Sequence, residues 1–149
     1  MMQRMRIPPW LVYALLSALA ASFVAIFGKI GMKEVDSNLA TTVRSIVMTT
    51  FLLAVCSFMG LWSRLSALSP RPILMIILSG LAGALSWLFY FRAIQLGSVS
   101  QVAPIDKLSM PLAVLLAVLL LQERPSGMNW LGIALIAGGA YLAALPRPG

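Results

Sequence analysis

The sequence has no histidine, a single cysteine and only four carboxylate side chains among its 149 residues. One cysteine excludes a disulfide within the chain. The acidic residues do not have the spacing of metal ligands, and no nucleophile stands beside a base, so the usual groups for catalysis are lacking. We therefore expect no enzymatic activity, no metal centre and no bound cofactor.

Charge is also scarce, because 10% of the residues are charged and 60% are hydrophobic. Soluble proteins carry roughly 25% charged residues, so this composition indicates an integral membrane protein. The net charge of +7 does not indicate nucleic-acid binding, because the eleven Lys and Arg residues are scattered singly around apolar runs. No stretch is left for a soluble domain, and we expect one transmembrane domain over residues 1–149.

Five apolar stretches are long enough to cross a bilayer, for which a helix needs about 20 residues. Breaker clusters of proline, glycine and serine separate several of them. The connections are short, so successive helices should be antiparallel neighbours. The sequence therefore predicts an all-α, polytopic bundle of five transmembrane helices, at residues 8–28, 39–62, 72–92, 98–121 and 128–145.

The first stretch has a second interpretation. Arg4 and Arg6 precede the apolar run, and Ala18 to Ala20 resembles a cleavage site, which are features of a signal peptide. The uncharged run is longer than a signal-peptide core of about 7 to 15 residues. A retained transmembrane helix is the favoured interpretation.

Small residues recur in the third and fifth predicted spans. Such residues let membrane helices approach closely, so we interpret them as packing residues and not as binding residues. They are Ser79, Gly80, Gly83, Ala84, Gly132, Gly138 and Gly139.

A charged pair, Asp106 and Lys107, lies inside the fourth apolar stretch. Charges in lipid are costly and normally mark a pathway or a binding site. The alternative is a loop, with the helix starting at Leu108, but residues 108–122 reach only about 22 Å at a rise of 1.5 Å per residue. A start near Ser98 restores the length and places the pair close to the middle of the membrane.

Pro104 and Pro111 bracket this pair. A proline removes the hydrogen bond to the carbonyl four residues earlier, so we expect free carbonyls at Ser100 and Lys107. Broken helices of this kind form midplane sites in transporters. Adjacent residues on a helix do not face each other, so Asp106 and Lys107 should have different partners. The alternative is that a neighbour neutralises each charge and the pair only fastens the bundle.

Three further residues are candidates for substrate binding together with Lys107 and Asp106. Arg44 lies about five residues inside the second predicted span, where snorkelling to the interface is the favoured interpretation and a cavity-facing position is the alternative. Trp87 and Tyr90 lie near the end of the third span. An interfacial aromatic belt is the favoured interpretation of these two residues, and a place in the substrate path is the alternative.

Six short features follow one another along the chain. They are the small residues through Ser22 to Gly28, Arg44 early in the second span, Leu88 to Ile94, Gln101 to Pro104, Leu121 to Arg124, and Trp130 to Gly132 with Gly138. In this order they resemble the EamA-type repeat of the drug/metabolite transporter superfamily, over roughly residues 10–145. The resemblance implies a secondary transporter that moves small organic metabolites or drugs across the cytoplasmic membrane. It supplies no catalytic residues.

Full members of that superfamily have two five-helix repeats, whereas this chain has one. An odd number of spans places the two ends on opposite sides, so two oppositely inserted copies would recreate an inverted repeat. Five basic residues, including Arg4 and Arg6, lie on the amino-terminal side. Three or four, including Lys29, Lys33 and Arg147, lie on the other. This bias is weak under the positive-inside rule, so dual topology stays open.

The chain is therefore expected to be one half of an inverted-repeat transporter. We expect it to work by alternating access as a homodimer, antiparallel if both orientations occur, or with a small paired subunit. The alternative is an accessory or lipid-carrier flippase half-subunit in a hetero-oligomeric membrane complex. There the same charges would hold a phosphate head group or another subunit.

Overall fold

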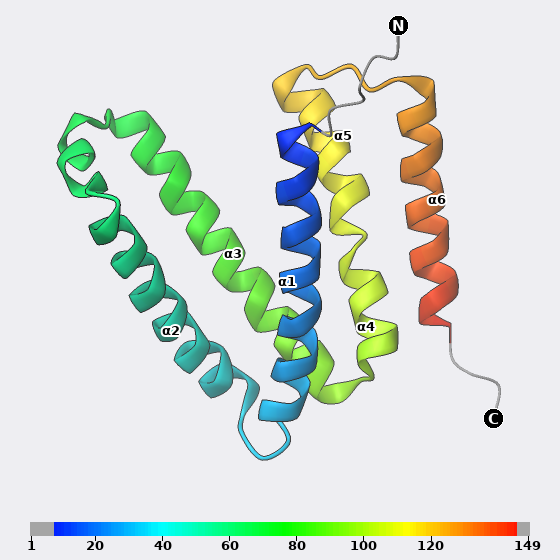
Figure 1. The fold of residues 1–149 in the computed structure, drawn as a ribbon. Coiled ribbons are helices and arrows are strands. Elements are labelled where there is room, and N and C mark those ends of the chain that lie inside the picture. The colour runs from blue at the N-terminus through cyan, green and yellow to red at the C-terminus, as the bar shows by residue number, and fades with distance from the viewer. Residues whose placement is uncertain (1–7, 146–149) are drawn as a thin grey trace, which may run out of the picture.

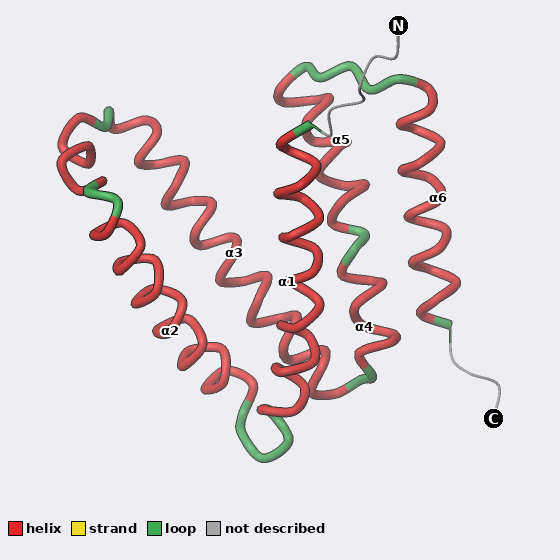
Figure 2. Tube along the Cα trace, viewed as in Figure 1, coloured by secondary structure: helices red, strands yellow, loops and turns green. Residues whose placement is uncertain are grey.

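The computed structural model describes residues 8–145, and within that range the chain forms helices and no strand (Figures 1 and 2). The predicted all-α membrane fold with five spans is confirmed, because five helical segments are long and apolar enough to cross a membrane. A short 3₁₀ helix, η1 (Leu61–Ala67), connects the second span to the third. The spans are α1 (Pro9–Gly31), α2 (Ser37–Phe58), α3 (Pro70–Leu96), the pair α4 (Val99–Asp106) and α5 (Ser109–Leu121), and α6 (Gly127–Ala144).

Local chemistry explains most helix ends. Pro9 and Pro70 stand at the first positions of α1 and α3, where a missing N–H removes no helical bond. The Asp36 carboxylate caps α2 by accepting the backbone N–H groups of Asn38 and Leu39. α2 ends at Phe58, earlier than the predicted residue 62, because Gly60 takes a left-handed conformation with φ of 65°.

The fourth span is interrupted at Lys107 and Leu108, between α4 and α5. Here the N–H groups of Lys107, Leu108 and Met110 bond to carbonyls three residues earlier instead of four. The Lys107 carbonyl thus accepts from Met110 at 3.0 Å, and the prediction that Pro111 leaves it free is wrong. The break brings the N–H of Met110 within hydrogen-bonding distance of this carbonyl. The span itself begins at Val99, close to the predicted start, so the charged pair is not in a connecting loop.

Two ends of the bundle can be distinguished. The end that contains the α1–α2 and α3–α4 connections, residues 32–36 and 97–98, is called the lower end. The upper end has η1 and the α5–α6 connection, residues 122–126. In Figure 1, α1 stands between the α2–α3 hairpin and the α4–α6 segment, and the hairpin leans away from it toward the upper end. α1 contacts α3 and α4, and α6 contacts both α4 and α5.

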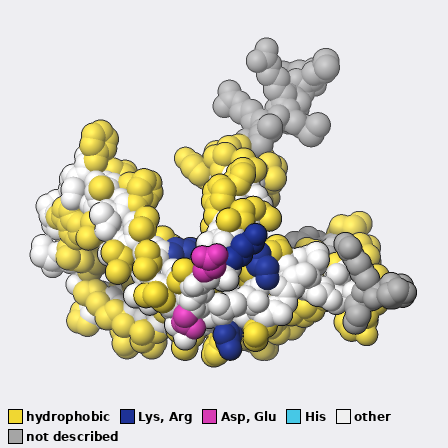
Figure 3. Space-filling model, turned by 90° about the horizontal axis from the view of Figure 1, so that it is seen from below, with side chains coloured by type: hydrophobic (Ala, Val, Ile, Leu, Met, Phe, Trp, Pro, Cys, Tyr) yellow, Lys and Arg dark blue, Asp and Glu magenta, His cyan; other side chains and the backbone are white. Residues whose placement is uncertain are grey.

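The packed core lies at the lower end. Ala25, Met32, Phe91 and Ile94 form one buried cluster, contributed by α1, the connection after it and α3. Gly28 permits the close contact of α1 and α3, because a Cβ at this position would collide with the Phe91 ring. Figure 3 views this end and shows basic and acidic side chains next to each other on it, with hydrophobic side chains around them.

The glycines farther from this core behave differently. A Cβ at any of them would meet no atom within 4 Å, so they bring no helices together within this chain. In a single copy these glycines do not pack against another helix, and the interpretation as packing residues stays a prediction for contacts between copies. These glycines are Gly80, Gly83, Gly132, Gly138 and Gly139.

Candidate functional site

Four of the five candidate residues line one cavity of about 230 Å³ between α1, α3 and the α4–α5 break. Trp87 and Tyr90 come from α3, and Asp106 and Lys107 come from the end of α4 and the break. Val24 of α1 forms part of the opposite wall. The fold therefore brings together the charged pair and the aromatic pair that the sequence places in different spans.

Lys107 and Asp106 form an ion pair with each other. Lys107 Nζ lies 3.1 Å from Asp106 Oδ2, and the two side chains are 54% and 30% exposed. The expectation of different partners is wrong, because it assumes a regular helix through both residues. Lys107 lies at the break, where helical periodicity no longer separates neighbouring side chains. The two charges largely neutralise each other at this point.

Arg44 lies on an aromatic surface of α3. Its Cζ is 3.8 Å from the centroid of the Trp87 ring and 5.2 Å from that of Phe91. These rings stack on each other with centroids 5.4 Å apart. A guanidinium over an aromatic face is attracted by the ring quadrupole. The guanidinium therefore points inward onto α3, and this position favours the cavity interpretation over snorkelling.

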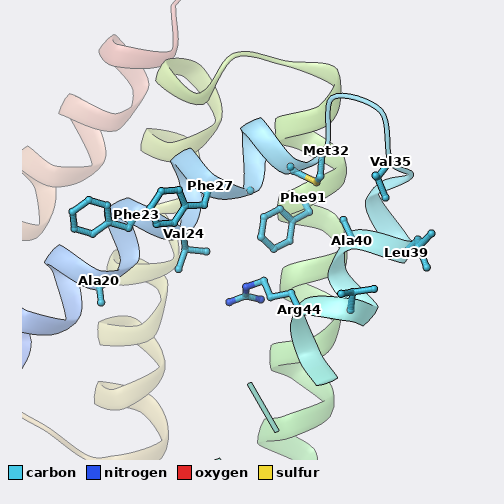
Figure 4. A pocket seen from close by; sticks show the side chains of 13 residues that line it. Ala20, Phe23, Val24, Phe27, Met32, Val35, Leu39, Ala40, Arg44 and Phe91 are labelled. Carbon is cyan, nitrogen blue, oxygen red and sulfur yellow. The ribbon is translucent and has the colours of Figure 1, made fainter. Parts of the chain in front are cut away.

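Arg44 also lines a larger cavity of about 580 Å³ between α1, α2 and α3. Figure 4, in which the α1–α2 connection lies at the top, shows the guanidinium extending from α2 into this space. In that view it lies below Phe91 and opposite Val24. Val24 lines both cavities, so α1 passes between them. The remaining wall is apolar and comes from residues that the sequence did not single out, among them Phe23, Phe27, Met32, Leu39, Val43 and Phe91.

The polar residues of both cavities lie at one depth. Arg44 is seven residues above the start of α2, about 10 Å at helical rise. Trp87 is nine residues above the end of α3, about 13 Å, and Lys107 is eight residues above the start of α4, about 12 Å. Measured along their helices, these residues therefore lie at a similar distance from the lower end of the bundle.

Lys29 is a polar residue whose position the sequence did not indicate. It lies in the last turn of α1, and its Nζ donates to the carbonyls of Ile94 at 2.6 Å and Gly97 at 2.8 Å. Carbonyls at a helix C-terminus have no partner within the helix, and a cation complements the negative end of the helix dipole. Lys29 thus joins α1 to the end of α3, although by sequence it counts only as a topology charge.

Charged and aromatic side chains that line cavities deep inside a multi-pass helical bundle are characteristic of membrane transport proteins. The chain belongs to the EamA-like transporter family, whose pattern matches residues 8–145. It is similar to a Sinorhizobium sp protein named "Uncharacterized transporter in cobO 3'region", with 43% identity over 136 residues. The alignment covers 91% of this chain and 96% of that protein. No solved structure matches the chain.

Proposed function

We propose that the protein is a secondary transporter of a small organic solute in the cytoplasmic membrane, working by alternating access. Membership of a transporter family supports transport as such. The observation that carries the mechanism is the cavity lined by Lys107, Asp106, Trp87 and Tyr90 at the α4–α5 break. Irregular backbone at membrane depth is tolerated where it lines a cavity or lies against protein, so this cavity is our candidate substrate path.

Each residue has a chemical role in this proposal. The Lys107 side chain is 54% exposed, so its ammonium can exchange the contact with Asp106 for one with a solute. Tyr90 meets Trp87 edge to face with ring centroids 5.7 Å apart, and the two rings shape an apolar wall beside the charges. Arg44 lies on the same Trp87 ring and contributes a second cation at the same depth.

Substitution of Lys107 tests this assignment. The purified protein is screened for solutes that raise its unfolding temperature, since binding to the folded state stabilises it. Hits are then measured for exchange in proteoliposomes. Lys107→Ala should weaken solute binding about tenfold, the loss of one charge-assisted contact. The rise in unfolding temperature at a given solute concentration should become smaller, and exchange at low solute concentration should fall about tenfold. Arg64→Ala in exposed η1 should leave both unchanged.

Labelling of a cysteine introduced at Ser109, which lines the same cavity, provides an independent check, with Cys56 replaced by Ser so that only the new thiol reacts. The alternating-access proposal requires reactivity from each compartment in turn and a response to the solute. Reactivity from one compartment alone, with no effect of any solute, would contradict the proposal.

The proposal includes a second copy of the chain, inserted in the opposite sense, or a small paired subunit. One chain supplies a single repeat, and transporters with midplane sites are commonly built from two. The described residues of α5 include none that is buried, and the glycines of α6 face open space. These faces are available to a partner. Tags on both ends that report one orientation, together with no copurifying partner, would contradict an antiparallel dimer.

A further inference from the structure

The larger cavity contains a cation whose charge is not compensated. Among residues 8–145, Arg44 forms no ion pair and no side-chain hydrogen bond, and its recorded partners are the Trp87 and Phe91 rings. Lys107, the other cation that lines these two cavities, pairs with Asp106. A guanidinium keeps its charge under all physiological conditions, so the described part of this layer carries an excess positive charge at Arg44.

The geometry leaves the hydrogen-bonding edge of this guanidinium free. Trp87 covers one face of the group at 3.8 Å. The N–H donors lie in the plane of a guanidinium, so stacking orients them without occupying them. Their fork matches the two oxygens of a carboxylate or phosphate. An anion that enters the cavity thus meets an oriented partner.

The rest of the cavity suits an apolar group. Its volume of about 580 Å³ lies within the range of roughly 300 to 1,000 Å³ that is typical of small-molecule sites. Phe23 and Phe27 of α1 and Leu39 and Val43 of α2 form much of the wall. A cation would be repelled by Arg44, and a neutral solute would leave its donors without a partner.

From these contacts we infer that this cavity binds an organic anion with an apolar body, whose carboxylate or phosphate is held by Arg44. The inference rests on the proposed transport function and specifies the class of solute. A free carboxylate and a lipid-type phosphate share this chemistry. In the alternative function, as a lipid-carrier flippase half-subunit, the bound anion would be the lipid-type phosphate.

Probes that share a naphthyl group and carry a negative, a neutral or a positive substituent test the inference. Binding of 2-naphthoate, naphthalene-2-carboxamide and 2-naphthylmethylammonium is measured by calorimetry on the full chain in nanodiscs. The carboxylate should bind about tenfold more tightly than the amide, as expected for one charge-assisted contact. The ammonium should bind most weakly.

Variants connect this preference to the residue. Arg44→Gln should abolish the preference for the carboxylate, Arg44→Lys should keep part of it, and Arg64→Gln in η1 should not change it. Arg44→Lys also serves if the glutamine variant does not fold. Equal binding of carboxylate and amide, tightest binding of the ammonium, or a preference that survives in Arg44→Gln would overturn the inference.

One further measurement identifies the source of the anion, and another tests the anion site independently of the proposed transport function. Dodecyl phosphate binding more tightly than dodecanoate and 2-naphthoate would support a lipid-type phosphate, and the reverse order would support a free carboxylate. Binding of the carboxylate without exchange of any bound probe in proteoliposomes would contradict transport and leave the anion site standing. Exchange of neutral or cationic solutes that is insensitive to Arg44 would support transport and overturn the anion site.

Discussion

The lower and upper ends of the bundle differ in how the chain packs against itself. At the lower end, Phe91 and Ile94 are 2% and 0% exposed. There the Gln95 side chain of α3 also donates a hydrogen bond to the Val35 carbonyl in the α1–α2 connection. At the upper end, Leu119 and Leu120 of α5 are each 74% exposed. Lipid is as apolar as leucine, so burial alone does not draw membrane helices together. The comparison indicates that close packing and polar contacts hold the lower end.

The largest expected effect is the loss of the Lys29 contact. Lys29→Met leaves the carbonyls of Ile94 and Gly97 without their donor, and two charge-assisted bonds contribute about 3 kcal/mol. The free energy of unfolding, measured in detergent, should fall by this amount. Lys33→Met removes the same charge from an exposed neighbour and should change it little. Equal effects of the two variants would show that Lys29 acts only as a surface charge.

Truncation of the lower core should have the next largest effect. Ile94 is fully buried, and Ile94→Ala removes its packing against the neighbouring helices. In water such changes cost 2 to 5 kcal/mol. Lipid replaces water as the surroundings of the unpacked side chain, so we expect about 2 kcal/mol. A cost below about 0.5 kcal/mol would mean that the lower end is not the stable part of the fold.

The same truncation at the upper end should have the smallest effect. In a single copy, Leu119→Ala removes a side chain that faces outward, and such substitutions usually stay within about 0.5 kcal/mol. Measurement at several protein-to-detergent ratios sharpens the comparison. A cost that grows with protein concentration would place Leu119 in a contact between copies, and a large cost independent of concentration would contradict the open upper end.

The spans could be predicted because they depend on local sequence. Long apolar runs define them. The exact ends were predicted less well, because Gly60 ends α2 before the predicted residue 62 and α3 begins at Pro70 instead of residue 72. The break in the fourth span was also indicated by its charges and prolines. Its hydrogen bonds were not, because the choice between carbonyls three and four residues away depends on the final backbone path.

Contacts between spans could not be predicted in the same way. A lysine at the end of an apolar run, such as Lys29, has the same local sequence whether it reaches water or the carbonyls of another helix. Depth alone does not decide whether Arg44 snorkels or lies on an aromatic ring. The glycines of α3 and α6 illustrate the same limit, because a small residue permits close approach and does not specify the neighbour.

The interrupted fourth span has a mechanical consequence. α6 is continuous from Gly127 to Ala144 and packs against the helices on both sides of the interruption, α4 and α5. A change of a few backbone dihedrals at positions 107 and 108 would tilt α5 on α4 while both keep their helical bonds. The pivot would lie at the depth of Trp87 and Arg44, so tilting would reshape the walls around a solute there and leave the lower anchorage in place.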